Sequence, residues 1–261
     1  MKLKIAFSMF LFASLVSVAQ LPVLKPDVEY DGYKGPVKNV RETLYEAFGT
    51  QAKPEKALKL ESSLTRYERS GKKIDVKYFT GEDELIFRIR HKRDGIGNIM
   101  LDQAIDPNDT VIGRTYYSFN PKNQLVEVIT YDQEQQLENR LHVRYNQDGI
   151  VSERSYNNRH NTIRRREVYT YNDFGTVAVT TVYDENKQKI QEIFYEYDDL
   201  LEVTSQTTFD YFNEEDPVIT VQMFTYKYDD FKNWIQKTEF IVEKGEYVPV
   251  LIIDRDFEYY R

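Results

Sequence analysis

The chain has 261 residues, and its 43 acidic against 35 basic side chains give a net charge of −8. This charge excludes the basic footprint typical of nucleic-acid-binding proteins. The absence of cysteine excludes disulfides, thiolate metal sites and a lipid-modified N-terminal cysteine. The 21 tyrosines and 15 phenylalanines favour β-strands over helices.

The N-terminus has the form of a secretory signal peptide. Lys2 and Lys4 precede an apolar run over residues 5–16, and residues 17–19 (SVA) supply the small residues of a cleavage site. The apolar run is shorter than the ~20 residues of a membrane-spanning helix. We therefore expect residues 1–19 to be removed, leaving an exported protein, periplasmic or extracellular, with no stable membrane span.

The next residues predict a linker and then the start of the folded domain. Residues 20–36 contain three prolines and two glycines and are expected to form an N-terminal tether. Residues 37–47 (VKNVRETLYEA) predict a first strand with Tyr45 on its aromatic face. Residues 48–61 contain glycine, proline and several lysines, for which a loop is favoured over a short helix. Residues 37–261 are expected to form a single β-repeat domain.

Two interleaved series of aromatic residues, nearly all followed by Asn or Asp, run through the chain. The first is Phe119-Asn120, Tyr145-Asn146, Tyr171-Asn172, Tyr197-Asp198 and Tyr228-Asp229; the second is Tyr131-Asp132, Tyr156-Asn157, Tyr183-Asp184, Phe209-Asp210 and Phe240. Spacings are 25–27 residues until both series lengthen to 31 at the same insertion, residues 211–217. Two series that shift together indicate a true repeat, and weaker upstream copies bring the number to about seven.

Each repeat predicts a β-hairpin. Asn and Asp side chains bond their own backbone in tight turns, and glycine tolerates a positive φ, as expected of Gly149 and Gly175. A β-rich run follows each turn, for example residues 125–131 (LVEVITY) and 177–183 (VAVTTVY). The two aromatic-Asx pairs of a repeat therefore mark the two strand ends of one hairpin.

The spacing of the aromatic residues predicts a sheet with one aromatic face. Alternate side chains of a strand share a face, so Tyr169 lies with Tyr171 and Tyr195 with Tyr197, while the opposite face is mostly wet. About fourteen strands at ~4.8 Å spacing would span ~65 Å, and open sheets rarely pass ~10 strands without curling. We expect an all-β antiparallel meander of about seven ~26-residue hairpin repeats, forming a twisted, curled single-layer sheet or an open barrel or solenoid-like ribbon.

The pattern Tyr-x-Tyr-Asn/Asp-x-x-Gly resembles the YD repeats of Rhs-like secreted proteins. Residues 226–235 (YKYDDFKNWI) also resemble the last unit of repeat proteins exported by Bacteroidetes. The resemblance covers about residues 60–261. It implies a shell or ribbon of β-hairpins and gives no catalytic residues to carry over.

Four residues are candidates for ligand binding. Trp234 stands where other repeats have valine or leucine, so core packing is favoured and sugar stacking is the alternative. Arg164, Arg165 and Arg166 form a cationic run, which is most simply a solvated strand edge that discourages edge pairing. The alternative for this run is contact with a phosphate or an acidic glycan.

Nothing in the sequence predicts a metal or a cofactor. The three histidines, His91, His142 and His160, are far apart and lack metal-binding or acid-base spacing. Asp-rich turns such as residues 198–199 and 229–230 lack the spacing of calcium-binding loops, and turn capping explains them.

The sequence predicts an exported, non-catalytic scaffold or binding module. Repeat proteins commonly use extended surfaces for recognition, so a glycan, a peptide or a cell-envelope protein is the expected partner, and nucleic acid is not. The alternative is an envelope- or polysaccharide-acting hydrolase with its site in non-repeated loops, around residues 213–217 or His160. No carboxylate pair stands out as a glycosidase acid and base.

Overall fold

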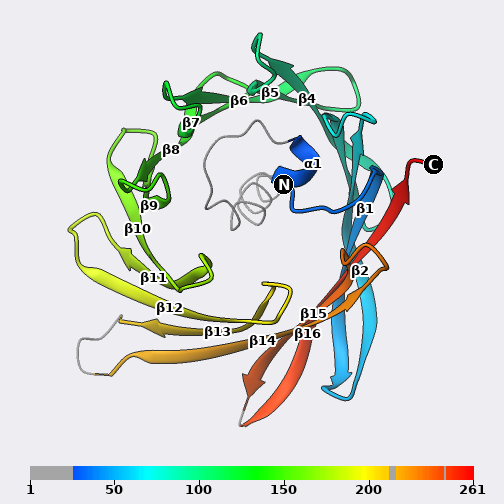
Figure 1. Ribbon diagram of the computed structural model, residues 1–261, viewed down its shortest axis with the longest axis vertical. Helices are drawn as coiled ribbons and strands as arrows, with labels where there is room; N and C mark the ends of the chain where they lie inside the picture. The colour runs from blue at the N-terminus through cyan, green and yellow to red at the C-terminus, as the bar shows by residue number, and fades with distance from the viewer. Residues whose placement is uncertain (1–25, 212–215, 244) are drawn as a thin grey trace.

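The structure, a computed structural model, describes residues 26–211, 216–243 and 245–261. It is one antiparallel sheet of sixteen strands that closes into a barrel (Figure 1). The expected signal peptide, residues 1–19, lies outside the described residues. The elements are α1 (Asp27–Tyr30), β1 (Val37–Thr50), β2 (Lys53–Tyr67), β3 (Lys73–Thr80), β4 (Leu85–Arg93), β5 (Ile99–Ile105), β6 (Val111–Phe119), β7 (Leu125–Asp132), β8 (Leu137–Tyr145), β9 (Val151–Asn157), β10 (Ile163–Tyr171), β11 (Val177–Tyr183), β12 (Lys189–Tyr197), β13 (Val203–Asp210), β14 (Val218–Tyr228), β15 (Trp234–Glu243) and β16 (Glu246–Tyr259).

The all-β antiparallel meander is confirmed, but the sheet is closed and not an open ribbon. β1 pairs with β16 in antiparallel register, from Val37 opposite Tyr259 to Glu46 opposite Leu251. Closure pairs the two edge strands, which an open ribbon would leave with unpaired backbone groups. The sixteen strands follow one another around the ring in chain order, and the expected number of about seven repeats is not confirmed.

The expected loop over residues 48–61 is wrong, because these residues end β1 and begin β2. Gly49 has a φ of +100° and pairs with Pro54 next to the turn of this hairpin. A proline is tolerated near a hairpin tip because the ladder needs few hydrogen bonds there. Register shifts between Leu44 and Ala47 show that the two strands are paired through bulges.

The two aromatic series mark the two rims of the barrel. Turns after the even-numbered strands form the first rim and turns after the odd-numbered strands form the second. In the first series, Asn146 Oδ1 accepts the backbone N–H groups of Asp148 at 3.0 Å and Ile150 at 2.9 Å. In the second, Asp184 Oδ1 accepts those of Asn186 and Gln188 at 2.9 and 2.8 Å. The predicted Asx turn chemistry is confirmed at both rims.

The aromatic face lines the inside of the barrel. α1 lies inside the ring of strands in Figure 1, and its Val28 packs with Val40 and Tyr67 on the inner face. Side chains of directly paired residues on neighbouring strands point to the same face of the sheet. Following the paired residues from β1 to β8 therefore identifies which side chains of β8 point inward. There Leu141 and Val143 are buried among tyrosines of β8 to β10.

Tyr45 lies on the outer face, so its predicted place among the inner rings is wrong. It pairs with Ile252, and β1 runs from Val40 to Tyr45 without a bulge, which puts these two residues on opposite faces. The ammonium group of Lys56 lies 4.8 Å from the centre of the Tyr45 ring. Several rings of the second series are also outside, such as Tyr131, which meets Tyr116 edge to face at 5.8 Å.

A repeated tyrosine contact ties four of the hairpins to the strand before them. In each case a tyrosine near the first rim donates its hydroxyl hydrogen to the backbone carbonyl of the first residue of an earlier strand. We call these contacts tyrosine clasps: Tyr145 to Leu125 at 2.8 Å, and Tyr171 to Val151, Tyr197 to Val177 and Tyr226 to Val203, all at 2.7 Å. The inner aromatic face therefore links neighbouring repeats by hydrogen bonds as well as by packing.

Candidate functional site

The barrel is closed at the first rim by a seam between the N-terminal segment and the last strands. In the stretch expected to be a tether, α1 is held by its Asp27, which pairs with Arg93 of β4. Further along, the Lys34 backbone N–H donates to Asn233 Oδ1 at 2.7 Å, and Asn233 Nδ2 donates to the Lys34 carbonyl at 2.8 Å. Asn233 Nδ2 also bonds the Tyr259 hydroxyl at 2.9 Å.

At this seam the ladder between β15 and β16 stops early. Pairing runs only as far as Gln236 opposite Asp254, although β16 continues to Tyr259. The ladder between β13 and β14 also stops early, at Ser205 opposite Met223. A register shift against β14 places Ile235 in a bulge between Trp234 and Gln236, as in other hairpins of the first rim. Residues 255–259 of β16 therefore have no ladder partner in β15, which leaves a gap on this side of the strand.

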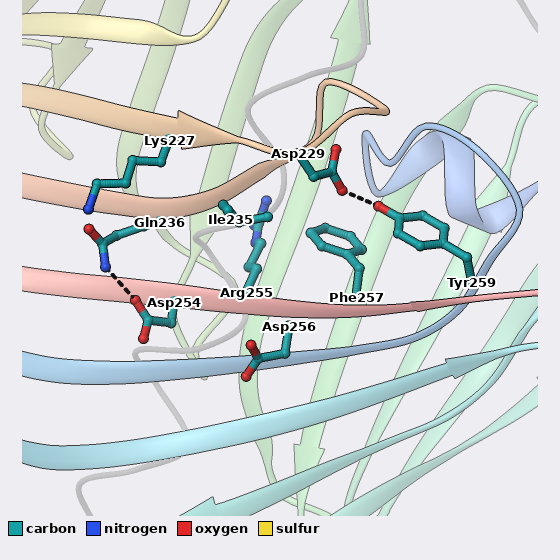
Figure 2. Close-up of a pocket in the computed structure, with 9 residues that line it drawn as sticks. All are labelled: Lys227, Asp229, Ile235, Gln236, Asp254, Arg255, Asp256, Phe257 and Tyr259. Carbon is teal, nitrogen blue, oxygen red and sulfur yellow. Dashed lines mark hydrogen bonds between the residues drawn. The ribbon is translucent and has the colours of Figure 1, made fainter.

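A pocket of about 400 Å³ occupies this gap. Asp254 and Asp256 line it from the outer face of β16, and Arg255, Phe257 and Tyr259 line it from the inner face. Figure 2 shows the Asp256 and Arg255 side chains leaving β16 in opposite directions. Residues from both faces of β16 line this pocket, and we call it the window.

Arg255 is fixed on the inner side of the window. Its Nε donates to Glu42 Oε2 at 2.7 Å, and these two residues are direct partners in the register of β1 and β16. Its guanidinium carbon lies 3.3 Å from the centre of the Trp234 ring and 5.2 Å from that of Tyr33. Cation–π contacts and the ion pair together hold the guanidinium between two rings.

The charges that line the window are mostly compensated. Asp254 accepts a hydrogen bond from Gln236 Nε2 at 2.9 Å and forms an ion pair with Lys56. Asp229 accepts from the backbone N–H of Asn233 at 2.9 Å and from the Tyr259 hydroxyl. Two oppositely charged groups at the outer mouth, Lys227 and Asp256, are exposed and form no ion pair within the described chain.

Two phenols near the inner side of the window stay neutral. Burial raises the pKa of the Tyr33 and Tyr226 phenols far above their ordinary value. Burial also raises the pKa of Glu202, which lies within electrostatic reach of Arg255. These phenols therefore act as hydrogen-bond donors at every physiological pH.

The structure places the four predicted binding residues in two separate regions. Trp234 does not line the window, but its ring lies against Arg255, which does, and 6.2 Å from that of Tyr226. Arg165 and Arg166 lie on opposite faces of β10, because they pair with consecutive residues of β9. Arg165 Nε donates to Glu167 Oε1 at 2.8 Å.

The arginine run does not form a single cationic patch. Arg166 lies 3.6 Å from a carboxylate oxygen of Glu153, and its guanidinium lies 4.5 Å from the centre of the Tyr183 ring. Arg164 is exposed near the start of β10. Because β10 and β15 lie on different parts of the ring, the run is not brought to Trp234 (Figure 1).

A second polar cluster lies on the inner wall at β4 to β6. His91 Nδ1 bonds Asp102 Oδ1 at 2.6 Å, and the Tyr117 hydroxyl donates to Asp102 Oδ2 at 2.9 Å. His91 Nε2 is buried and has no hydrogen-bond partner in the described part of the chain. Within residues 26–211, 216–243 and 245–261, no group of three or more His, Asp or Glu side chains is arranged to hold a metal ion.

Sequence reasoning missed Arg255, Glu42 and Tyr33. These residues come from the two ends of the chain and meet only because β1 pairs with β16. Tyr33 lies in a proline- and glycine-rich stretch that predicts a linker, so no local pattern marks it as buried. The position of Asn233 just after the turn of its repeat could be predicted from the sequence. Its hydrogen bonds to Lys34 could not, because they form only when the barrel closes.

No protein-family model and no curated protein matches the chain. Among solved structures, a porin-like protein from Bacteroides uniformis is similar over 87% of this chain and 99% of its own, at 10% identity and a TM-score of 0.57. At this identity the similarity shows a shared β-barrel fold. The YD-repeat resemblance has no match to a family model and stays a prediction.

Two further similarities are weaker. A porin-like protein from Bacteroides vulgatus aligns over 86% of this chain and 98% of its own, at 12% identity and a TM-score of 0.33. The TcdB2-TccC3-Cdc42 complex aligns over 85% of this chain and 15% of its own, at 10% identity and a TM-score of 0.34.

In the described residues, no helix combines the length and apolarity needed to cross a membrane.

Proposed function

We propose that the chain is an exported, non-catalytic binding module that folds as a closed barrel in water and takes its ligand at the window. The observation that carries this proposal is the contrast between the two faces of β8, whose mid-strand side chains are charged on the outside and aliphatic on the inside.

β8 shows the contrast within one strand. Leu141 and Val143 are buried on the inside, whereas Arg140 and Arg144 point outward. The Arg144 side chain is 73% exposed and lies 3.2 Å from Glu153. An arginine facing lipid at the middle of a bilayer costs about 2–4 kcal/mol, so an outer wall of this kind suits water.

The window supports a binding role. Its volume of about 400 Å³ falls within the size range of ligand pockets, roughly 300–1,000 Å³. A rigid frame around a preformed pocket reduces the entropy cost of binding.

A transport pore is the second candidate, favoured by the barrel fold shared with the Bacteroides uniformis porin-like protein. Its outer wall would have to face lipid, which the charges of β8 oppose. No observation favours the hydrolase alternative. A non-catalytic role and a location in the periplasm or outside the cell are part of the proposal.

Purification of residues 20–261 without detergent separates the two candidates. We expect a monodisperse protein with a β-rich circular dichroism spectrum and no conductance steps when it is added to planar lipid bilayers. Glycan-array and pull-down measurements on the same sample then identify the class of partner. A protein that needs detergent to stay dispersed, and that forms channels, would contradict the proposal.

A further inference from the structure

We propose that the window binds a small, uncharged sugar unit that carries an acetamido group. This rests on the proposed function, because it names the ligand class of the same site. Four properties of the window lead to it: compensated charge, an unpaired strand edge, free polar groups at the mouth, and closed ends.

The compensated charges point to a neutral ligand. Asp229, Asp254 and Arg255 already have hydrogen-bond or ion-pair partners within the chain. At these three groups a charged ligand would have to displace a partner and leave a charge unpaired. The two lining residues without an ion pair, Lys227 and Asp256, have opposite charges, so together they favour neither sign. Hydroxyl groups both donate and accept, so they add bonds to such groups without displacing the existing ones.

The edge of β16 points to an amide. Between Asp254 and Tyr259 this strand has β1 on one side and, within the described chain, no strand on the other. Backbone N–H and C=O groups that are not paired need a partner. An acetamido group presents one N–H and one C=O in the geometry of a peptide, so it can bond this edge as one residue of a neighbouring strand would.

The mouth and walls suit the rest of a sugar. Lys227 and Asp256 are exposed at the mouth, carry opposite charges and are free to bond hydroxyl groups. Ile235 and Phe257 supply apolar surface for a methyl group and for the C–H face of a sugar ring. The window thus combines a few polar groups with apolar surface, as small-ligand pockets do.

The closed ends of the window disfavour a peptide strand. At one end Gln236 is paired with Asp254, and at the other Asn233 and Asp229 bond the Tyr259 hydroxyl. The free edge between these ends covers about four residues, or roughly 13 Å of extended chain. A bound strand would have to turn sharply at both ends, whereas one sugar unit fits between them.

Ligand titrations monitored by NMR or calorimetry test this inference on residues 20–261. We expect saturable binding of N-acetylglucosamine, and binding of glucose and of glucosamine that is weaker by about tenfold or more, because each lacks the amide. A capped tetra-alanine peptide should not compete. Ile235→Trp, which fills the window from its bulge, should abolish binding.

The matched control is Ile96→Trp, which makes the same change at an isoleucine that is 61% exposed in the turn between β4 and β5. It should bind as the unchanged protein does, and circular dichroism should show both variants folded. The inference is overturned if N-acetylglucosamine does not bind the folded protein, if Ile235→Trp binds normally, or if the peptide binds instead. If N-acetylglucosamine does not bind, or if the peptide binds instead, a detergent-free barrel without conductance would leave the proposed function standing. Normal binding by Ile235→Trp would also remove the window as the binding site of the proposed function.

Discussion

The wall from β7 to β12 and the seam at β14 to β16 are built from the same repeat and are held together differently. In the wall, each hairpin is tied to the one before it by an Asx turn and a tyrosine clasp, over about twenty residues of sequence. In the seam, Asn233 bonds Lys34 across 199 positions. Local contacts thus extend the sheet, and long-range contacts close it and create the window.

The largest effect is expected in the core beneath the seam. Tyr67 is 1% exposed and packs with Val28, Val37 and Val40, so Tyr67→Ala should lower the free energy of unfolding by about 3–5 kcal/mol. Urea denaturation measures this loss. Tyr67→Phe, which keeps the ring and removes only the hydrogen bond to Asp31, should lose much less. Equal losses would show that the ring does not stabilise the seam.

A smaller effect is expected in the wall, where the rings are half-buried. Tyr171→Ala should lower the free energy of unfolding by about 3 kcal/mol, since it removes both the ring and the clasp to Val151. Tyr171→Phe removes the clasp alone and should cost about 1 kcal/mol. Thermal and urea unfolding measure both variants. Because Tyr145 and Tyr197 make the same clasp, their Phe variants should show similar losses, and a large spread would argue against equivalent repeats.

The smallest effect concerns an ion pair on the outer wall. Hydrogen bonds from the Arg66 guanidinium lower the pKa of Asp75 below its ordinary value. A lowered pKa adds stability at pH values above the ordinary carboxyl pKa of about 3.9, and this stability is lost as the pH falls through the folded-state pKa.

Urea denaturation of the unchanged protein and of Arg66→Met at several pH values checks this pair. The difference between them should be under about 1 kcal/mol at pH 6 and should shrink below pH 4, because the pair is partly exposed. A difference that grows as the pH falls would contradict this assignment of the shift.

Much of the wall could be predicted from the sequence. Asn146 and Asp184 identified turns because their side chains act on backbone only two to four residues away. The strands between them were visible because alternation is also local. The long β1–β2 hairpin was missed because Gly49 and Pro54 suggest a loop unless the pairing of their strands is known.

The seam and the window could not be predicted in the same way. Arg255, Glu42 and Tyr33 carry no shared motif, and their contacts exist only after the ends of the sheet meet. Trp234 could be identified as a candidate from its residue type, but the contact of its ring with the Arg255 guanidinium could not be predicted. The window could not be predicted from the bulge at Ile235, because other hairpins of the first rim have the same one-residue bulge.

Closure of the barrel is tested most directly by spin labels on β1 and β16. The chain has no cysteine, so Asn39→Cys with Glu258→Cys places a single pair of labels at partnered positions. A closed barrel predicts strong dipolar broadening in the electron paramagnetic resonance spectrum, because adjacent strands are about 4.8 Å apart. Sixteen strands laid side by side in an open ribbon would span about 70 Å, and an interspin distance of several tens of ångströms would contradict closure.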